Sequence, residues 1–124
     1  MLRRDQTEAL IQVSRPSRYL GGELGSICKD DAGIEVRMAL AFPDVYEVGM
    51  SHIGFPILYN ILNRLDWVAA ERIYSPWADM EEWLCEHQQP LCSLESTLPL
   101  SDFDIVGFTP VSYTHLTLPT ICSV

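Results

Sequence analysis

The apolar residues follow two different spacings, and their order along the chain predicts alternating strands and helices. A nearly continuous apolar run at residues 35–42 is typical of a strand covered on both faces, as parallel sheets require, and further strands are expected at residues 69–74 and 102–109. Helical spacing at residues 54–65 and 76–87 predicts a crossover helix after each of the first two strands. The β-α-β-α-β order predicts an α/β fold with a doubly wound parallel sheet, Rossmann-like or flavodoxin-like and incomplete in this sequence.

Local signals place the two helices more closely. Pro56 fits the first turn of a helix, so a start near Gly54 is favoured over one capped by Ser51. Ser75 is the expected N-cap of the second helix, and Pro76 its first residue. The apolar stripe of the first helix is Ile57, Leu58, Ile61, Leu62 and Leu65, and the buried face of the second is Met80, Trp83, Leu84 and His87. Residues 90–96 are expected to form a short strand.

The chain before the first strand has a different character. Residues 5–13 predict a short helix, and Pro16 with the Gly21-Gly22 pair predicts an ordered loop or arm. The basic and aromatic side chains of this arm either dock onto a part of the protein beyond this sequence or lie on the surface; they are Arg15, Arg18 and Tyr19. We therefore divide the chain into a helix and arm (1–34), a truncated α/β domain (35–109) and a tail (110–124).

The charge distribution limits the partners of the domain. The net charge is −9, and residues 35–109 hold three basic side chains against twelve acidic ones. Such a surface repels a phosphate backbone, which argues against nucleic-acid binding by this segment. The N-terminus lacks the apolar core of a signal peptide, and no apolar run approaches the ~20 residues that span a bilayer. We expect a cytoplasmic protein with no membrane association.

The loop after the first strand carries the candidate ligand-binding residues. It follows a strand and precedes a helix, and ligands of parallel sheets bind at the carboxyl ends of strands. Asp44 and Glu47 could bind a ligand hydroxyl or amide, or be solvated acids. Tyr46 could stack on a ligand or cover the sheet edge, and Gly49 allows tight backbone geometry for a ligand or for chain reversal. Ser51 and His52 complete the set, although a lone histidine near a helix start is more often a cap than a metal ligand.

Several familiar chemistries lack their motifs. The sequence has no GxxxxGK[ST] phosphate loop, no GxGxxG dinucleotide turn and no GxSxG nucleophile elbow. The four cysteines (Cys28, Cys85, Cys92 and Cys122) form neither a CxxC pair nor a CxxxCxxC triplet. The sequence therefore predicts no metal site and no catalytic residue of its own.

The end of the chain does not read like the rest. The ten residues Val111-Ser112-Tyr113-Thr114-His115-Leu116-Thr117-Leu118-Pro119-Thr120 resemble a translated transposon-end sequencing adapter. We interpret residues 110–124 as non-native and expect the natural sequence to be cut off near Thr109. No function is assigned to His115, Thr117 or Cys122.

Four separated segments resemble one protein family. They are Arg15 to Glu23 (RPSRYLGGE), Ala39 to His52 (ALAFPDVYEVGMSH), Ser93 to Ser96 (SLES) and Asp102 to Thr109 (DFDIVGFT). In this order they resemble the start of a radical-SAM family whose members carry a cobalamin-binding-like domain before the radical-SAM barrel. The likeness covers roughly residues 5–109.

The resemblance implies a cobalamin-binding-type α/β domain followed by a barrel that holds a 4Fe-4S cluster on a CxxxCxxC motif. The cluster reduces S-adenosylmethionine to a 5′-deoxyadenosyl radical. This sequence contains no such cysteines, so its partners would be its own downstream barrel and a small-molecule cofactor.

Cobalamin stays open as that cofactor. In the DxHxxG motif of histidine-ligating corrinoid carriers, Met50 and Phe55 replace Asp and Gly around His52. Two possibilities remain. The domain binds cobalamin without a protein ligand to cobalt, or it binds no cobalamin. The alternatives are a stand-alone flavodoxin-like module for a corrinoid or nucleotide, and a pure interaction domain.

Overall fold

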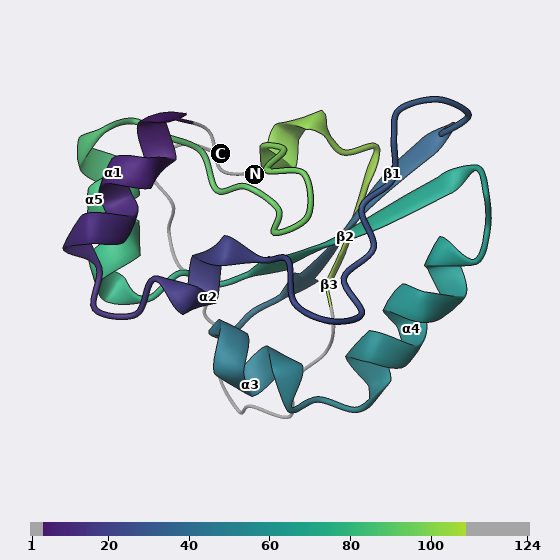
Figure 1. Ribbon diagram of the computed structural model, residues 1–124, viewed down its shortest axis with the longest axis horizontal. Coiled ribbons are helices and arrows are strands. Elements are labelled where there is room, and N and C mark those ends of the chain that lie inside the picture. The colour runs from purple at the N-terminus through teal and green to yellow at the C-terminus, as the bar shows by residue number, and fades with distance from the viewer. Residues whose placement is uncertain (1–3, 109–124) are drawn as a thin grey trace.

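The computed structural model describes residues 4–108, which form an α/β unit around a parallel sheet (Figure 1). Its strands are β1 (Val36–Phe42), β2 (Val68–Tyr74) and β3 (Ile105–Phe108), in the spatial order β2-β1-β3. β1 pairs with β2 from Val36 opposite Val68 to Phe42 opposite Tyr74. The predicted fold class is therefore confirmed, and the carboxyl ends of β1 and β2 meet at one edge.

β1 and β2 are covered on both faces, which explains their largely apolar sequences, whereas Ile105 and Phe108 of β3 are about half exposed. On one face, Leu40, Phe42, Ala70 and Tyr74 pack against Phe55 and Tyr59 of α4 (Gly54–Asn63). On the other face, Ala39 and Ile73 pack against Phe103, which follows the 3₁₀ helix η1 (Leu100–Asp102). All seven residues of β2 are buried.

α4 begins at Gly54 as predicted, but its buried face differs from the predicted stripe. Phe55 and Tyr59 are buried in the core and Leu62 packs partly against it. The predicted stripe residues Ile57, Leu58, Ile61 and Leu65 are instead exposed. The helix is apolar on more than one side, so the large aromatic side chains, which bury the most area, decide which side faces the sheet.

The loop after β1 contains a helix that sequence patterns did not predict. α3 (Tyr46–Met50) starts where the Val48 and Gly49 N–H groups donate to the Val45 carbonyl, at 3.1 and 3.0 Å. This single turn directs the chain from the end of β1 toward α4. A helix this short lacks the repeated apolar spacing from which helices are predicted.

The second crossover helix is α5 (Ala78–Glu86), which starts two residues later than predicted. Ser75 does not cap it, because Trp77 holds the N-cap position. Met80, Trp83 and Leu84 are buried as predicted. His87 is exposed, contrary to the prediction, and its ring stacks on Trp83 at 4.1 Å.

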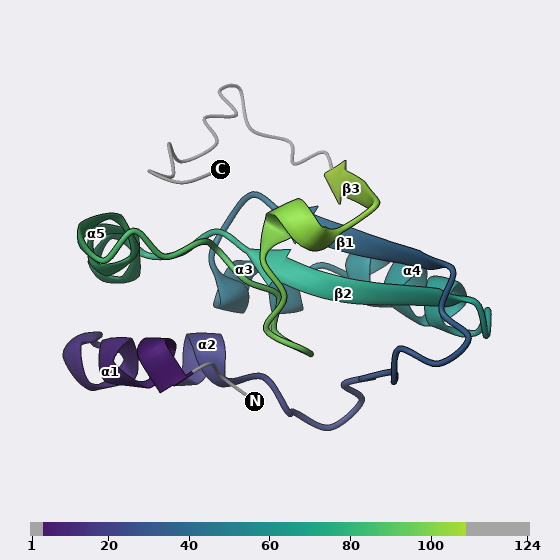
Figure 2. The ribbon, with the colours of Figure 1, turned by 90° about the horizontal axis from the view of Figure 1, so that it is seen from above.

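The N-terminal helix and arm pack against the rest of the described chain. Ala9 and Val13, at the end of α1 (Arg4–Gln12), share a buried cluster with Met80, Trp83 and Leu84 of α5. Figure 2 shows α1 and α5 as neighbours beside the sheet. The arm continues through α2 (Ser17–Leu20). The division at residues 34 and 109 stays a prediction, and the 110–124 tail lies outside the described residues.

Residues 90–96 form no strand in the described structure, contrary to the prediction. They take part in one isolated bridge, between Cys92 and Pro99. The segment runs along the outer edge of β2, where the Leu94 N–H donates to the Arg72 carbonyl at 3.0 Å. Covering an edge strand in this way removes a site for pairing with other chains.

Among residues 4–108 there is no helix with the length and apolarity to cross a membrane.

Candidate functional site

The six predicted site residues all lie at the carboxyl end of β1, and most of them serve local structure. Asp44 closes the turn after the strand, because its Oδ1 accepts the Val45 N–H at 2.7 Å. The Ser51 hydroxyl donates to the Glu47 carbonyl at 2.9 Å, within the turn of α3. These two side chains hold the backbone of the loop that carries the other four.

Glu47 anchors the N-terminal arm. Both of its carboxylate oxygens accept from Arg18 Nε, at 2.8 and 2.9 Å, and Arg15 contacts it at 3.3 Å. The hydrogen bond from Arg18 lowers the pKa of Glu47 despite some desolvation. Arg18 also lies over the Trp77 ring, and the Tyr19 hydroxyl accepts the Trp77 N–H at 3.1 Å. The arm thus docks onto this chain itself, and not only onto a part beyond it.

Gly49 and Tyr46 pack against Tyr74 at the carboxyl end of β2. A Cβ on the buried Gly49 would overlap Cε1 and Cδ1 of the Tyr74 ring. Tyr46 meets Tyr74 edge-on, with ring centroids 5.4 Å apart. Here Gly49 allows a close approach between backbone and ring, which fits chain reversal and packing and not a ligand contact.

His52 caps α4. Its Nδ1 accepts the Phe55 N–H at 3.2 Å, and its ring lies 5.4 Å from the Phe42 ring. When Nδ1 of a neutral imidazole accepts a hydrogen bond, the proton sits on Nε2, which then has no lone pair for a metal. The residues present therefore do not fit histidine-ligated cobalt.

The capping role of His52 is open to a direct test. We expect His52→Ala to lower the free energy of unfolding by about 1 kcal/mol, because the Phe55 N–H loses its acceptor. His52→Asn, whose side-chain oxygen can accept the same hydrogen bond, should recover most of the loss. Urea unfolding of the three proteins measures this; equal stabilities would show that His52 is no cap.

The structure reveals a buried polar cluster that sequence patterns did not predict. Its centre is Arg72 of β2, whose side chain is only 7% exposed. Arg72 Nε donates to Glu95 Oε1 at 2.6 Å, and Nη1 donates to Glu23 Oε1 at 2.7 Å. The guanidinium lies 5.0 Å from the ring centroid of Tyr59, whose hydroxyl donates to Glu95 at 3.0 Å. We call Glu23, Tyr59, Arg72 and Glu95 the Arg72 cluster.

The electrostatics of the Arg72 cluster reflect burial and opposite charges. Burial raises the pKa of Glu95, and Arg72 opposes that rise. The Glu95 carboxyl accepts hydrogen bonds from Arg72 Nε, from the Tyr59 hydroxyl and from the Arg72 N–H at 2.8 Å, so the ionised form fits the site. Burial and the Glu95 charge raise the pKa of Tyr59 to about 12. The tyrosine therefore remains a neutral donor at physiological pH.

A second buried carboxylate, Glu71, ties the same segment to β2. It accepts from Arg37 at 2.9 Å, from the Ser93 hydroxyl at 2.8 Å and from the Ser96 N–H at 3.0 Å. Glu71 thus holds the Ser93–Ser96 motif against the outer edge of β2. The sequence signal for these buried contacts was the charged Glu71-Arg72 pair inside an otherwise apolar strand, since buried charges require partners.

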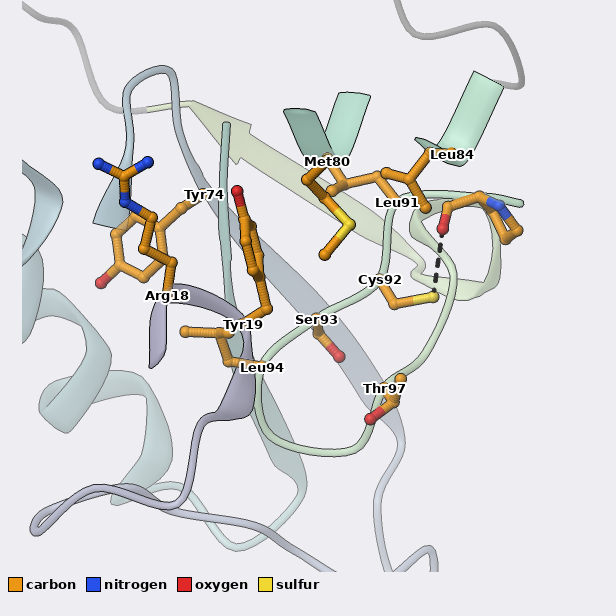
Figure 3. Close-up of a pocket in the computed structure, with 11 residues that line it drawn as sticks. Arg18, Tyr19, Tyr74, Met80, Leu84, Leu91, Cys92, Ser93, Leu94 and Thr97 are labelled. Atoms are coloured by element: carbon orange, nitrogen blue, oxygen red, sulfur yellow. Dashed lines mark hydrogen bonds between the residues drawn. The ribbon is translucent and has the colours of Figure 1, made fainter. Parts of the chain in front are cut away.

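Two cavities adjoin these elements. One of about 180 Å³ lies between the Glu23–Gly25 loop, the end of α3, the first turns of α4 and the Arg72 cluster. A smaller one, of about 50 Å³, is lined by Arg18 and Tyr19 of α2 and by Met80 and Leu84 of α5 (Figure 3). Of these two, the larger cavity borders the buried charges.

Comparison with known proteins identifies the family. Residues 54–118, more than half of the chain, match the family described as radical SAM proteins, N-terminal. The chain belongs to this family. No curated protein and no solved structure matches it. The matched range contains α4, β2, α5 and β3, and so includes Arg72, Glu71 and Glu95.

Membership in a radical-SAM family implies a 4Fe-4S cluster and S-adenosylmethionine in the full protein. Within residues 4–108, no group of three or more His, Cys, Asp or Glu side chains is placed to hold a metal ion. Cys28 is an exposed thiol, and the Cys92 thiol donates to the Pro90 carbonyl at 3.5 Å. The described part of this radical-SAM N-terminal chain therefore does not itself fit the cluster.

Proposed function

We propose that this chain is the N-terminal part of a radical-SAM enzyme whose cluster-binding cysteines lie in a downstream barrel. The observation that carries the proposal is the family match over residues 54–118. When bound, the cluster would supply the electron for reductive cleavage of S-adenosylmethionine. This N-terminal part would then support catalysis without performing it.

Exposed apolar residues along α4 support an interaction of this chain with a further domain. Ile57 and Ile61 of α4, with Ile53 just before the helix and Leu65 just after it, recur every four residues and are all exposed, Ile53 by 80%. Side chains four apart share one side of a helix, and an exposed apolar row of this kind marks an interaction surface. In the proposed arrangement the downstream barrel covers this row.

Histidine-ligated cobalamin is not supported as the ligand of this domain, because His52 Nδ1 already accepts the Phe55 N–H. The larger cavity has a volume of about 180 Å³. That cavity instead favours the second candidate function, a module that binds a small ligand. No reaction step is assigned to a corrinoid.

The complete reading frame and its purified protein product test the proposal. We expect the complete reading frame to encode CxxxCxxC downstream of β3. Its product, purified without oxygen and reduced, should cleave S-adenosylmethionine, whereas residues 1–110 alone should bind no iron. A complete frame without that motif, or a reconstituted product that leaves S-adenosylmethionine intact, would refute the assignment.

A further inference from the structure

The larger cavity combines apolar walls with buried charged groups. Met50, Phe55 and Pro56 contribute its apolar side, whereas Glu23 and Arg72 contribute its charged side. Its volume of about 180 Å³ equals that of about six water molecules at ~30 Å³ each. The cavity is therefore large enough for one compact organic molecule.

The charges beside the cavity do not cancel. Arg72 supplies one positive charge, and Glu23 and Glu95 supply two negative ones. The guanidinium nitrogens are all engaged, with Glu95 at Nε, Glu23 and Met50 at Nη1, and Ser26 at Nη2. The cluster thus has one negative charge in excess and no free guanidinium nitrogen for an anionic ligand.

The Glu23 carboxylate is the incompletely paired negative group of the cluster. Glu23 Oε1 accepts from Arg72 at 2.7 Å and from the Tyr46 hydroxyl at 3.3 Å. Glu23 Oε2 is buried, and no group within residues 4–108 hydrogen-bonds to it. A buried carboxylate oxygen without a donor is costly, and a positive charge in the adjoining cavity would offset part of that cost.

Glu23 is ionised at neutral pH. Burial pushes the pKa of its carboxyl upward, but the hydrogen bond and charge of Arg72 outweigh this and leave it below its usual value. The neighbouring Tyr74 hydroxyl has a weak partner, Met50 Sδ at 3.5 Å. Burial raises the pKa of Tyr74 to about 12, so this hydroxyl stays protonated.

We propose that this cavity is a binding site for a small molecule with a protonated amine on a compact apolar body. The ammonium group would lie beside the Glu23 carboxylate and neutralise the excess charge. The apolar body would lie against Met50, Phe55 and Pro56. The inference goes beyond the proposed radical-SAM role and does not depend on it, because every group it uses lies in the described chain.

The test uses the 124-residue chain and benzylamine as the probe, followed by ligand-observed NMR titration. We expect saturable binding with a Kd of about 1 mM, in the range of small fragments. Benzyl alcohol, which lacks the charge, and phenylacetate, which reverses it, should bind at least about tenfold more weakly.

Two variants locate the site, and one serves as the control. Glu23→Gln should weaken benzylamine binding about tenfold, and circular dichroism checks that it remains folded. Asn60→Phe narrows the cavity from α4 without touching the Glu23–Arg72 pair, and should weaken binding even if Glu23→Gln fails to fold. Glu86→Gln, on the exposed side of α5, removes the same charge elsewhere and should leave the affinity unchanged.

Three results would overturn the proposal. These are no saturable binding of benzylamine, equal binding of benzyl alcohol, and affinities in Glu23→Gln and Asn60→Phe that match the parent. The first would mean that the cavity holds water only. None of them bears on whether the full protein cleaves S-adenosylmethionine, so the two proposals fail separately.

Discussion

Replacing Glu95 with glutamine is expected to lower the free energy of unfolding by about 3–5 kcal/mol, because it removes one partner of a buried ion pair and sets an amide against hydrogen-bond donors. The Glu95 side chain is 0% exposed. Oε1 accepts from Arg72 Nε and the Tyr59 hydroxyl, and Oε2 accepts from the Arg72 N–H. An amide nitrogen at either position would face a donor with another donor.

Glu47→Gln is the matched control for this change. Glu47 also pairs with arginine, but its side chain is 43% exposed, and exposed ion pairs contribute about 0–1 kcal/mol. Urea unfolding followed by circular dichroism compares the two variants with the parent. Since whole domains are stable by only about 5–15 kcal/mol, the loss in Glu95→Gln would be a large share of the total stability. Similar losses in the two variants would show that the Arg72 cluster contributes little.

Gly49→Ala is the second change with a large expected effect. The new Cβ would lie 2.5 Å from Cδ1 and 3.2 Å from Cζ of Tyr74. The Tyr74 ring cannot easily move, because it packs against Tyr46 at 5.4 Å and against Phe55 at 5.7 Å. Overpacking of this kind costs about 1–3 kcal/mol, and more where the neighbours are rigid.

Gly54→Ala separates this steric effect from glycine replacement in general. A Cβ on Gly54 would lie 3.3 Å from Cε1 of the exposed His52 ring, which can shift. Alanine is the better helix former, so this variant should match the parent or gain up to about 1 kcal/mol. In a Tyr74→Leu background, Gly49→Ala should cost less than in the parent, because the clashing ring is gone. An unchanged cost there would mean that the clash with Tyr74 is not the cause.

The strands could be predicted from sequence because their burial on both faces leaves a continuous apolar record. β1 and β2 differ from their predicted bounds by only one residue. The orientation of α4 could not be predicted, since apolar residues occur on both its inner and outer sides and only the aromatic packing distinguishes them. α3 was missed because five residues are too few to show a period.

The position of the predicted site loop follows from the strand pattern, whereas the contacts of its side chains do not. The loop after β1 does sit at the carboxyl edge of the sheet, yet Glu47 and His52 serve the arm and a helix cap. The Arg72 cluster joins groups from the arm, α4, β2 and the 93–96 segment. Sequence spacing carries no record of such long-range convergence. The charged pair inside β2 was the available sign that buried partners exist.

The adjacent charges of β2 also fix the alignment of the strand. Glu71 contacts Arg37, whereas Arg72 contacts Glu23 and Glu95 on the other side. A shift of β2 by one residue would exchange the sides on which its side chains lie. Arginine would then face arginine, or a carboxylate would face two carboxylates, so mispaired strands would be penalised by repulsion as well as by lost packing. A sheet built mostly from interchangeable small and aliphatic residues thereby acquires a unique way to assemble.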